Sequence, residues 1–229
     1  MNYSHLVLEA GRRMLREGIT IGTWGNISAR DAQTGTIYIT PSGMAYDALT
    51  EEDIVALRPD GSALRGERRP SVETPLHLAV YAARPDCGAV VHTHPIYSTA
   101  FSAMGEDIPL FLDEAAQVLG DTVRTARYAL PGSPELAANC VEALGEKGMA
   151  CLLRAHGAVC LGATMEKAFL VSRVLEATAR IYSLIRSMGG GAEPFSPERL
   201  AAMEEFMAHR YGQTETQSQS PSNESDPFC

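Results

Sequence analysis

Short apolar runs alternate along this chain with longer segments of helical periodicity, and this alternation limits the folds that the chain can adopt. The apolar runs are bordered by glycine, proline or aspartate, as β-strands commonly are. We predict strands at residues 36–40, 54–57, 88–92 and 149–153. Apolar residues recur at helical spacing in segments 4–16 and 164–188, which predicts two amphipathic helices. Strands interleaved with helices around a sheet indicate an α/β or α+β architecture.

Three further helices are predicted by a hydroxyl residue followed directly by proline. The pairs are Thr74-Pro75, Ser133-Pro134 and Ser196-Pro197. The hydroxyl can accept a hydrogen bond from the first turn, and proline at the first helical position has no amide hydrogen to leave unpaired. We therefore expect helices over residues 75–84, 135–144 and 198–207.

The composition favours one globular enzyme-sized domain and argues against a nucleic-acid or membrane partner. A chain of 229 residues with 45% hydrophobic content can bury a sizeable core, and we assign residues 1–212 to a single domain. The net charge is -9 and no basic run is present that could follow a phosphodiester backbone. No signal peptide or membrane-length apolar stretch is visible, so we expect a cytoplasmic protein. Residues 213–229 have few apolar side chains to bury and are expected to form a disordered polar tail.

The cysteines do not indicate a disulfide framework or a thiolate zinc site. Their number is odd, and no two of them have CxxC spacing. Four are expected to be buried thiols, because free cysteine is among the most buried residue types. These are Cys87, Cys140, Cys151 and Cys160.

Three histidines follow predicted strands and are candidates for a metal site. His92 and His94 lie two residues apart in VVHTHP, so their side chains project from one face of an extended segment. His156 follows a second apolar strand, and Gly157 beside it would allow a tight turn. Three imidazoles with one open position are a common ligand set for catalytic zinc. The alternative is an ordinary hydrogen-bonded His-x-His pair, and the other histidines, His77 included, fit such a structural role better.

Five motifs occur together along the chain: GTWGNIS (22–28), TPSGM (40–44), PSVETPLH (70–77), VVHTHP (90–95) and LLRAHG (152–157). Their order and spacing resemble those of the class II aldolases, a family that also includes adducin-like domains. The resemblance extends from about Leu6 to Tyr211. It implies a three-layer α/β fold with a central, mostly antiparallel sheet flanked by helices.

The family resemblance also implies roles for particular residues. One divalent cation per subunit, zinc or alternatively manganese, would be held by Glu73 and the three histidines, and Glu73 would also act as general acid and base. Without the resemblance, Glu73 is better explained as an acidic residue stabilised at a helix N-terminus. Small polar groups in the first three motifs would hold the phosphate of the substrate, although alone they read as ordinary polar turns. These substrate-binding residues are Thr23, Gly25, Asn26, Ser42, Gly43 and Ser71.

Two departures from the family pattern bear on substrate and mechanism. Where the family often has two serines before the acid, this chain has Ser71-Val72, which removes one hydroxyl from the phosphate site. Where the fuculose-phosphate type has a tyrosine acid, this chain has Asp113 and Glu114. Tyr211 resembles a tyrosine that some members contribute from a neighbouring subunit, which predicts a homo-oligomer, most simply a tetramer; a packed terminal aromatic is the alternative.

The resemblance implies a metal-dependent carbon–carbon lyase acting on a small ketose, with a sugar phosphate as the expected substrate and an enediolate stabilised by zinc. Glu73 would move the proton at carbon, while Asp113, Glu114 or Tyr211 would serve the hydroxyl of the departing aldehyde. The alternatives with the same metal site are epimerisation, dehydration or decarboxylation of a related sugar phosphate. A non-catalytic adducin-like binding domain is the alternative from another class.

Overall fold

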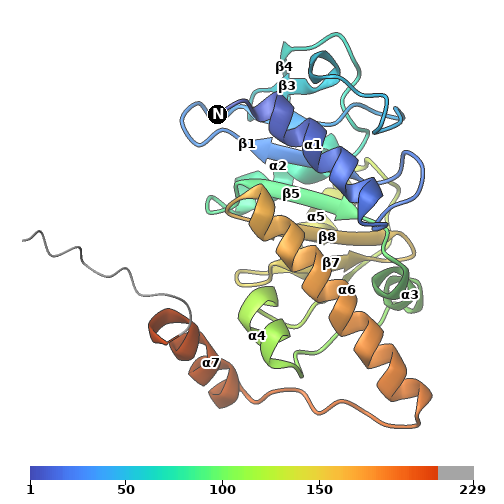
Figure 1. Cartoon of the computed structure of the whole chain (residues 1–229), viewed down its shortest axis with the longest axis vertical. Helices are drawn as coiled ribbons and strands as arrows, with labels where there is room; N and C mark the ends of the chain where they lie inside the picture. Colours follow the sequence, from blue (N-terminus) through green and yellow to red (C-terminus); the bar gives the residue numbers. More distant parts are fainter. Residues whose placement is uncertain (211–229) are drawn as a thin grey trace, which may run out of the picture.

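An eight-stranded sheet forms the centre of the computed structural model, which describes residues 1–210 (Figure 1). The strand order is β4-β3-β2-β1-β5-β8-β7-β6, and every neighbouring pair is antiparallel except β6 and β7. The mostly antiparallel α/β sheet that we predicted is therefore confirmed. The strands are β1 (Asn26–Arg30), β2 (Ile37–Ile39), β3 (Val55–Leu57), β4 (Ala63–Arg65), β5 (Ala89–Thr93), β6 (Thr125–Ala126), β7 (Ala150–Leu153) and β8 (Gly157–Gly162).

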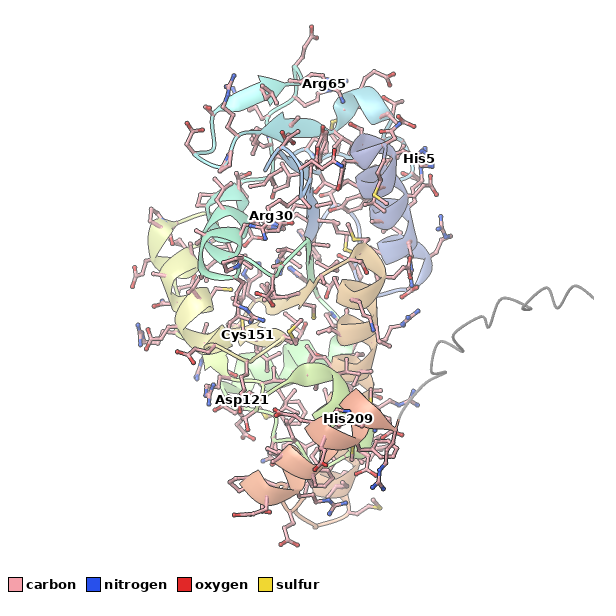
Figure 2. The ribbon with its side chains drawn as sticks, turned by 90° about the vertical axis from the view of Figure 1, so that its left-hand side faces the viewer. His5, Arg30, Arg65, Asp121, Cys151 and His209 are labelled. Carbon is pink, nitrogen blue, oxygen red and sulfur yellow. The ribbon has the colours of Figure 1, made fainter. Side chains whose placement is uncertain are left out.

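Helices cover both faces of this sheet and complete a three-layer arrangement. Helices α1 and α6 lie on one face and α2 and α5 on the other, with the sheet seen nearly edge-on between them in Figure 2. Helix α7 packs against α4 at the end of the molecule. The helices are α1 (Tyr3–Arg16), α2 (Thr74–Ala83), α3 (Ile96–Met104), α4 (Asp113–Leu119), α5 (Pro134–Leu144), α6 (Met165–Ser187) and α7 (Pro197–His209), with a 3-10 turn at Glu51–Asp53.

The core is divided by the sheet, because side chains alternate between its faces. In β5, Val90 packs with α2 and α5, whereas Val91 packs with α1 and the start of α6. His92 is two residues after Val90 and therefore faces the α2 side. The strand thus carries a polar side chain into the buried layer beside α2, where such a group requires hydrogen-bonding partners.

The predicted helices and strands are present, with ends that differ by one or two residues. Ser133 and Ser196 cap α5 and α7 as expected, accepting hydrogen bonds from the backbone N–H groups of Leu136 and Arg199. The expected cap at Thr74 is wrong: Glu73 occupies the N-cap of α2, and its side chain makes no capping bond. The carboxylate is used elsewhere, as described below.

Several elements were not predicted. The motif at residues 22–28 reads by itself as a polar turn, but residues 26–30 form β1, a central strand paired with β2 and β5. Ile27 and Ala29 are buried on one face of this strand, and Asn26 and Ser28 are buried on the other. The polar residues conceal the strand, because strand recognition relies on buried apolar side chains. The other missed elements are β4, β6, β8, α3 and α4.

The four cysteines predicted to be buried are free and buried, which confirms that expectation. No helix within residues 1–210 is both long and apolar enough to cross a membrane. Tyr211 and the predicted tail at 213–229 lie outside the described residues.

Candidate metal centre and active site

Three imidazoles converge at one edge of the α2 side of the sheet. His92 is in β5 and His94 follows its end, while His156 lies in the turn between β7 and β8. Antiparallel pairing of Thr93 with Ala158 brings that turn next to His94. The ring centroids of the three histidines are 4.8 to 5.0 Å apart, and one ligand atom from each lies within 4.8 Å of the others. The convergence expected from the sequence is present.

Glu73 joins this cluster from the N-cap of α2. Its side chain is 3% exposed, and its Oε2 lies 3.0 Å from His92 Nε2. Oε1 lies 3.7 Å from His156 Nε2. Asn26, which pairs with His92 across β1 and β5, donates from Nδ2 to Oε2 at 2.8 Å. A carboxylate and three imidazoles therefore face one small volume.

The donor set fits a divalent cation. His92 Nδ1 must donate to the carbonyl oxygen of Ala158, 2.9 Å away, so in the neutral ring Nε2 carries the lone pair. That Nε2 faces His94 Nε2 at 3.1 Å, a separation suited to two nitrogens sharing a cation at about 2.0–2.1 Å each. Glu73 Oε1 is buried with no hydrogen-bond partner in the described chain. Such unpaired buried atoms are rare unless a ligand or ion uses them.

The pKa values of the clustered side chains also favour binding of a cation. Burial opposes ionisation of Glu73, yet the charge of His92 and its hydrogen bond outweigh burial and keep the pKa of Glu73 well below its usual range. Burial likewise acts to lower the pKa of His92, but the Glu73 carboxylate raises it overall. Burial, together with His92, lowers the pKa of His94 to about 3 and that of His156 to about 4. At neutral pH two imidazoles are therefore uncharged beside a carboxylate, which is the protonation state that metal binding requires.

Two glycines permit the close approach of the strands that carry the ligands. Gly25 has φ +75°, and a Cβ there would meet the carbonyl oxygen of His92 at 2.6 Å. Gly157 was expected to allow a tight turn, and this is wrong, because it is the first residue of β8 and its φ lies outside the left-handed region. Its role is spatial: a Cβ would lie 2.5 Å from Thr93 O and 2.9 Å from His94 Cδ2.

The turn that carries His156 is held by Ser102 of α3. Ser102 Oγ donates to the Leu153 carbonyl at 2.9 Å and accepts from the His156 N–H at 3.2 Å. The Ser102 carbonyl accepts from the N–H of Ala155, whose φ of 53° is in the left-handed region. That conformation is unfavourable for a residue with a Cβ, so the three hydrogen bonds compensate for local strain.

The residues predicted to bind substrate line one cavity of about 380 Å³ together with Glu73, His94 and His156. Asn26 has its amide oxygen and nitrogen already engaged by His77 and Glu73, so it supports the site from within. The predicted residues on the wall are Thr23, Gly25, Asn26, Ser42, Gly43 and Ser71. A larger cavity of about 570 Å³, near Arg30 and Asp86, contains none of the three histidines, so the chemistry belongs to the smaller one.

The predicted second acid is not part of this cavity within one chain. Asp113 and Glu114 begin α4 and line a separate hollow beside α7. Asp113 lies 3.5 Å from Arg199 of that helix. Tyr211 lies outside the described residues.

Two residues at the site were missed by sequence reasoning. Trp24 is 62% exposed and stacks on His94 with ring centroids 6.2 Å apart, and Pro131 also lines the cavity. An exposed tryptophan in a glycine-rich turn was a usable signal, because such residues are often at binding surfaces. His77 was interpreted as a structural histidine, and its buried ring is hydrogen-bonded as that interpretation expects, with Nε2 lying 2.6 Å from Asn26 Oδ1.

The structure thus combines an α/β fold with three imidazoles and a carboxylate that together could hold a metal ion, as in metal-dependent enzymes. The chain belongs to the class II aldolase and adducin family, because the model of the class II aldolase and adducin N-terminal domain matches residues 5–183. It is an enzyme of this superfamily, as its relatives indicate.

Curated relatives and solved structures agree on this assignment. The chain is 35% identical over 183 residues to 5-deoxy-D-ribulose 1-phosphate aldolase of Bacillus thuringiensis serovar kurstaki, covering 80% of this chain and 85% of the relative. It is 34% identical to L-fuculose phosphate aldolase of Escherichia coli (strain K12), covering 89% and 93%. A solved L-fuculose 1-phosphate aldolase superposes with a TM-score of 0.86 at 32% identity, covering 90% of this chain and 96% of the other.

Proposed function

We propose that this protein reversibly cleaves a carbon–carbon bond in a small ketose, with a sugar phosphate as its substrate. The observation that carries the proposal is the shared cavity, in which Glu73, His94 and His156 lie together with small polar groups. The described residues 1–210 contribute no lysine or arginine to its lining, so within this part of the chain a phosphate would be held by hydroxyls and backbone N–H groups. Ser71 suits this task, because its Oγ accepts from the Glu73 N–H at 3.2 Å and keeps its own hydrogen for a ligand.

We assign the cation to Glu73, His92, His94 and His156. Imidazole ligands with one carboxylate suit zinc best, and manganese is the alternative. When bound, the cation would act as a Lewis acid toward the carbonyl and hydroxyl oxygens of the ketose.

Glu73 is the proposed general acid and base. In the cleavage direction a base takes the proton of the hydroxyl on the departing carbon, the carbon–carbon bond breaks, and its electron pair remains with the ketose fragment. Glu73 then delivers a proton to the carbon of that fragment, and in synthesis it removes the same proton. Its burial among the histidines keeps bulk water away from this transfer.

The second acid and base is proposed to come from Asp113, Glu114 or Tyr211. Because Asp113 and Glu114 line a separate hollow in their own chain, they would reach the reaction only across a subunit boundary. This is consistent with the homotetramer that we expect. Tetrameric assembly and cytoplasmic localisation both remain predictions.

The test is a screen of phosphorylated and unphosphorylated ketoses for aldehyde release, with and without chelator. We expect release that chelation abolishes, and a reduction of about a hundredfold or more in Glu73→Gln. Conversion without aldehyde would indicate the epimerase, dehydratase or decarboxylase alternative. Purified protein that binds no metal and converts no ketose would support the non-catalytic binding domain and contradict the proposal.

A further inference from the structure

A chain of four hydrogen bonds runs through the buried interior from Glu73 to α2's far end. Asn26 Nδ2 lies 2.8 Å from Glu73 Oε2, and His77 Nε2 lies 2.6 Å from Asn26 Oδ1. Ser28 Oγ lies 2.6 Å from His77 Nδ1 and 2.8 Å from Tyr81 Oη. All five residues are at most 6% exposed, and His77 and Ser28 are fully buried.

The chemistry of the groups allows one direction for this chain. A carboxylate only accepts, so Asn26 donates to Glu73 and its amide oxygen must accept from His77 Nε2. The neutral imidazole then accepts at Nδ1, so Ser28 donates to it, and Tyr81 donates to Ser28. Each of the four hydrogen bonds thus has one donor and one acceptor. This assignment fixes the tautomer of His77 and the orientation of the Asn26 side-chain amide.

The two carboxylate oxygens of Glu73 consequently differ. Oε2 is held by Asn26 and faces His92, whereas Oε1 is buried with no hydrogen-bond partner among residues 1–210. The helix gives Glu73 no compensating restraint, because its side chain makes no capping hydrogen bond to α2. Apart from the contact with His92, the orientation of the carboxylate therefore depends on Asn26, and that of Asn26 on His77.

We propose that His77 is a positioning residue: acting through Asn26, it fixes Glu73 Oε2 so that Oε1 is the oxygen that exchanges a proton with the substrate. The proposed role of Oε1 in proton exchange rests on the function proposed above. The proposed orientation of the Glu73 carboxylate does not, because it can be tested through metal binding alone. The competing explanation is that the chain only satisfies buried polar groups and contributes stability.

Two neutral polar variants separate these explanations. In His77→Gln, the amide nitrogen can take the place of Nε2 and donate to Asn26 Oδ1. In His77→Asn, the shorter side chain can accept from Ser28 but does not reach Asn26. Each loses one end of the imidazole, so a purely structural role predicts similar losses in both.

We would measure zinc affinity by competition with a chromophoric chelator, kcat and KM with the ketose found in the screen, and the thermal midpoint. For His77→Asn we expect zinc affinity lower by about tenfold or more, as for other residues that orient a ligand. We also expect kcat lower by about tenfold or more with KM changed by less than about threefold, because a misplaced acid affects turnover before binding. His77→Gln should stay within about threefold of the parent in zinc affinity, kcat and KM.

The same substitutions in a Glu73→Gln background complete the test. If His77 acts through Glu73, His77→Asn should add no further loss of zinc affinity or kcat there. Equal losses of zinc affinity and kcat in His77→Asn and His77→Gln would overturn the proposal. So would a double variant in which the fold-losses of His77→Asn and Glu73→Gln multiply. If no ketose is cleaved, the proposed function fails, while the zinc-affinity cycle still decides the positioning role.

Discussion

Replacing Gly157 with alanine should damage the metal centre without touching a ligand. The backbone of Gly157 does not require glycine, since its φ lies outside the left-handed region, so the effect is one of space. The added Cβ would lie 2.5 Å from Thr93 O, 2.9 Å from His94 Cδ2 and 3.3 Å from His92 Cε1. The first two distances are too short for non-bonded atoms, so Thr93 O and the His94 ring would have to move. The His94 ring is a proposed metal ligand.

The magnitude follows from the cost of overpacking. Inserting a methyl group into a filled interior costs about 1–3 kcal/mol when the surroundings must shift. For a protein of this size each kcal/mol lowers the thermal midpoint by about 2–4 °C, so we expect a loss of about 2–12 °C in the metal-free protein. Because His94 must move to relieve the contact, zinc affinity should fall by about ten- to a hundredfold.

The assay is thermal unfolding of the metal-free protein combined with zinc titration against a chromophoric chelator. Gly191→Ala is the matched control, because a Cβ at Gly191 meets nothing within 4 Å and the residue is exposed. We expect parental zinc affinity in the control. A Gly157→Ala protein with parental zinc affinity would refute the reasoning, since the ligand rings would then not be confined as the structure indicates.

Three further outcomes are expected. Ser102→Ala should cost about 1–3 kcal/mol in urea unfolding and weaken zinc binding, because it frees the His156 turn. Ser98→Ala, on the same helix, should cost stability but leave zinc affinity intact, because the buried Ser98 Oγ donates to Glu176 Oε2 at 2.7 Å and contacts no proposed ligand. Val72→Ser should lower KM for a phosphorylated ketose by about tenfold or more, because the new hydroxyl adds one hydrogen bond to a charged group. An unchanged KM would count against a phosphate bound beside residue 72 in the cavity. Iodoacetamide should leave four thiols of the native protein unmodified by mass spectrometry and label them after denaturation, because burial excludes the reagent and raises the pKa of two of them to about 11 and about 12; labelling in the native state would contradict their placement. The thiols are Cys87, Cys140, Cys151 and Cys160.

The sequence determined the features that depend on neighbours along the chain. Ser133 and Ser196 cap their helices because each hydroxyl finds its N–H partner three residues away. Amphipathic periodicity identified the long helices for the same reason, since the pattern reports burial of one face. His92 and His94 could be placed together because residues two apart in a strand share a face. The roles of Glu73 and of the predicted phosphate-binding residues came from the family resemblance. The spacing of residues along the chain does not indicate these roles.

Strand pairing decided the rest. Asn26 lies beside His92, and Thr93 beside Ala158, only because β1 and β8 flank β5 in that register. A shift of one residue would turn the same side chains to the opposite face of the sheet, and the local sequence does not specify the shift. The connection from His77 through Asn26 to Glu73 was therefore hidden in a segment that reads as a polar turn. The tertiary structure assigned these roles because a buried polar group must find its partner in three dimensions, wherever that partner lies in the chain.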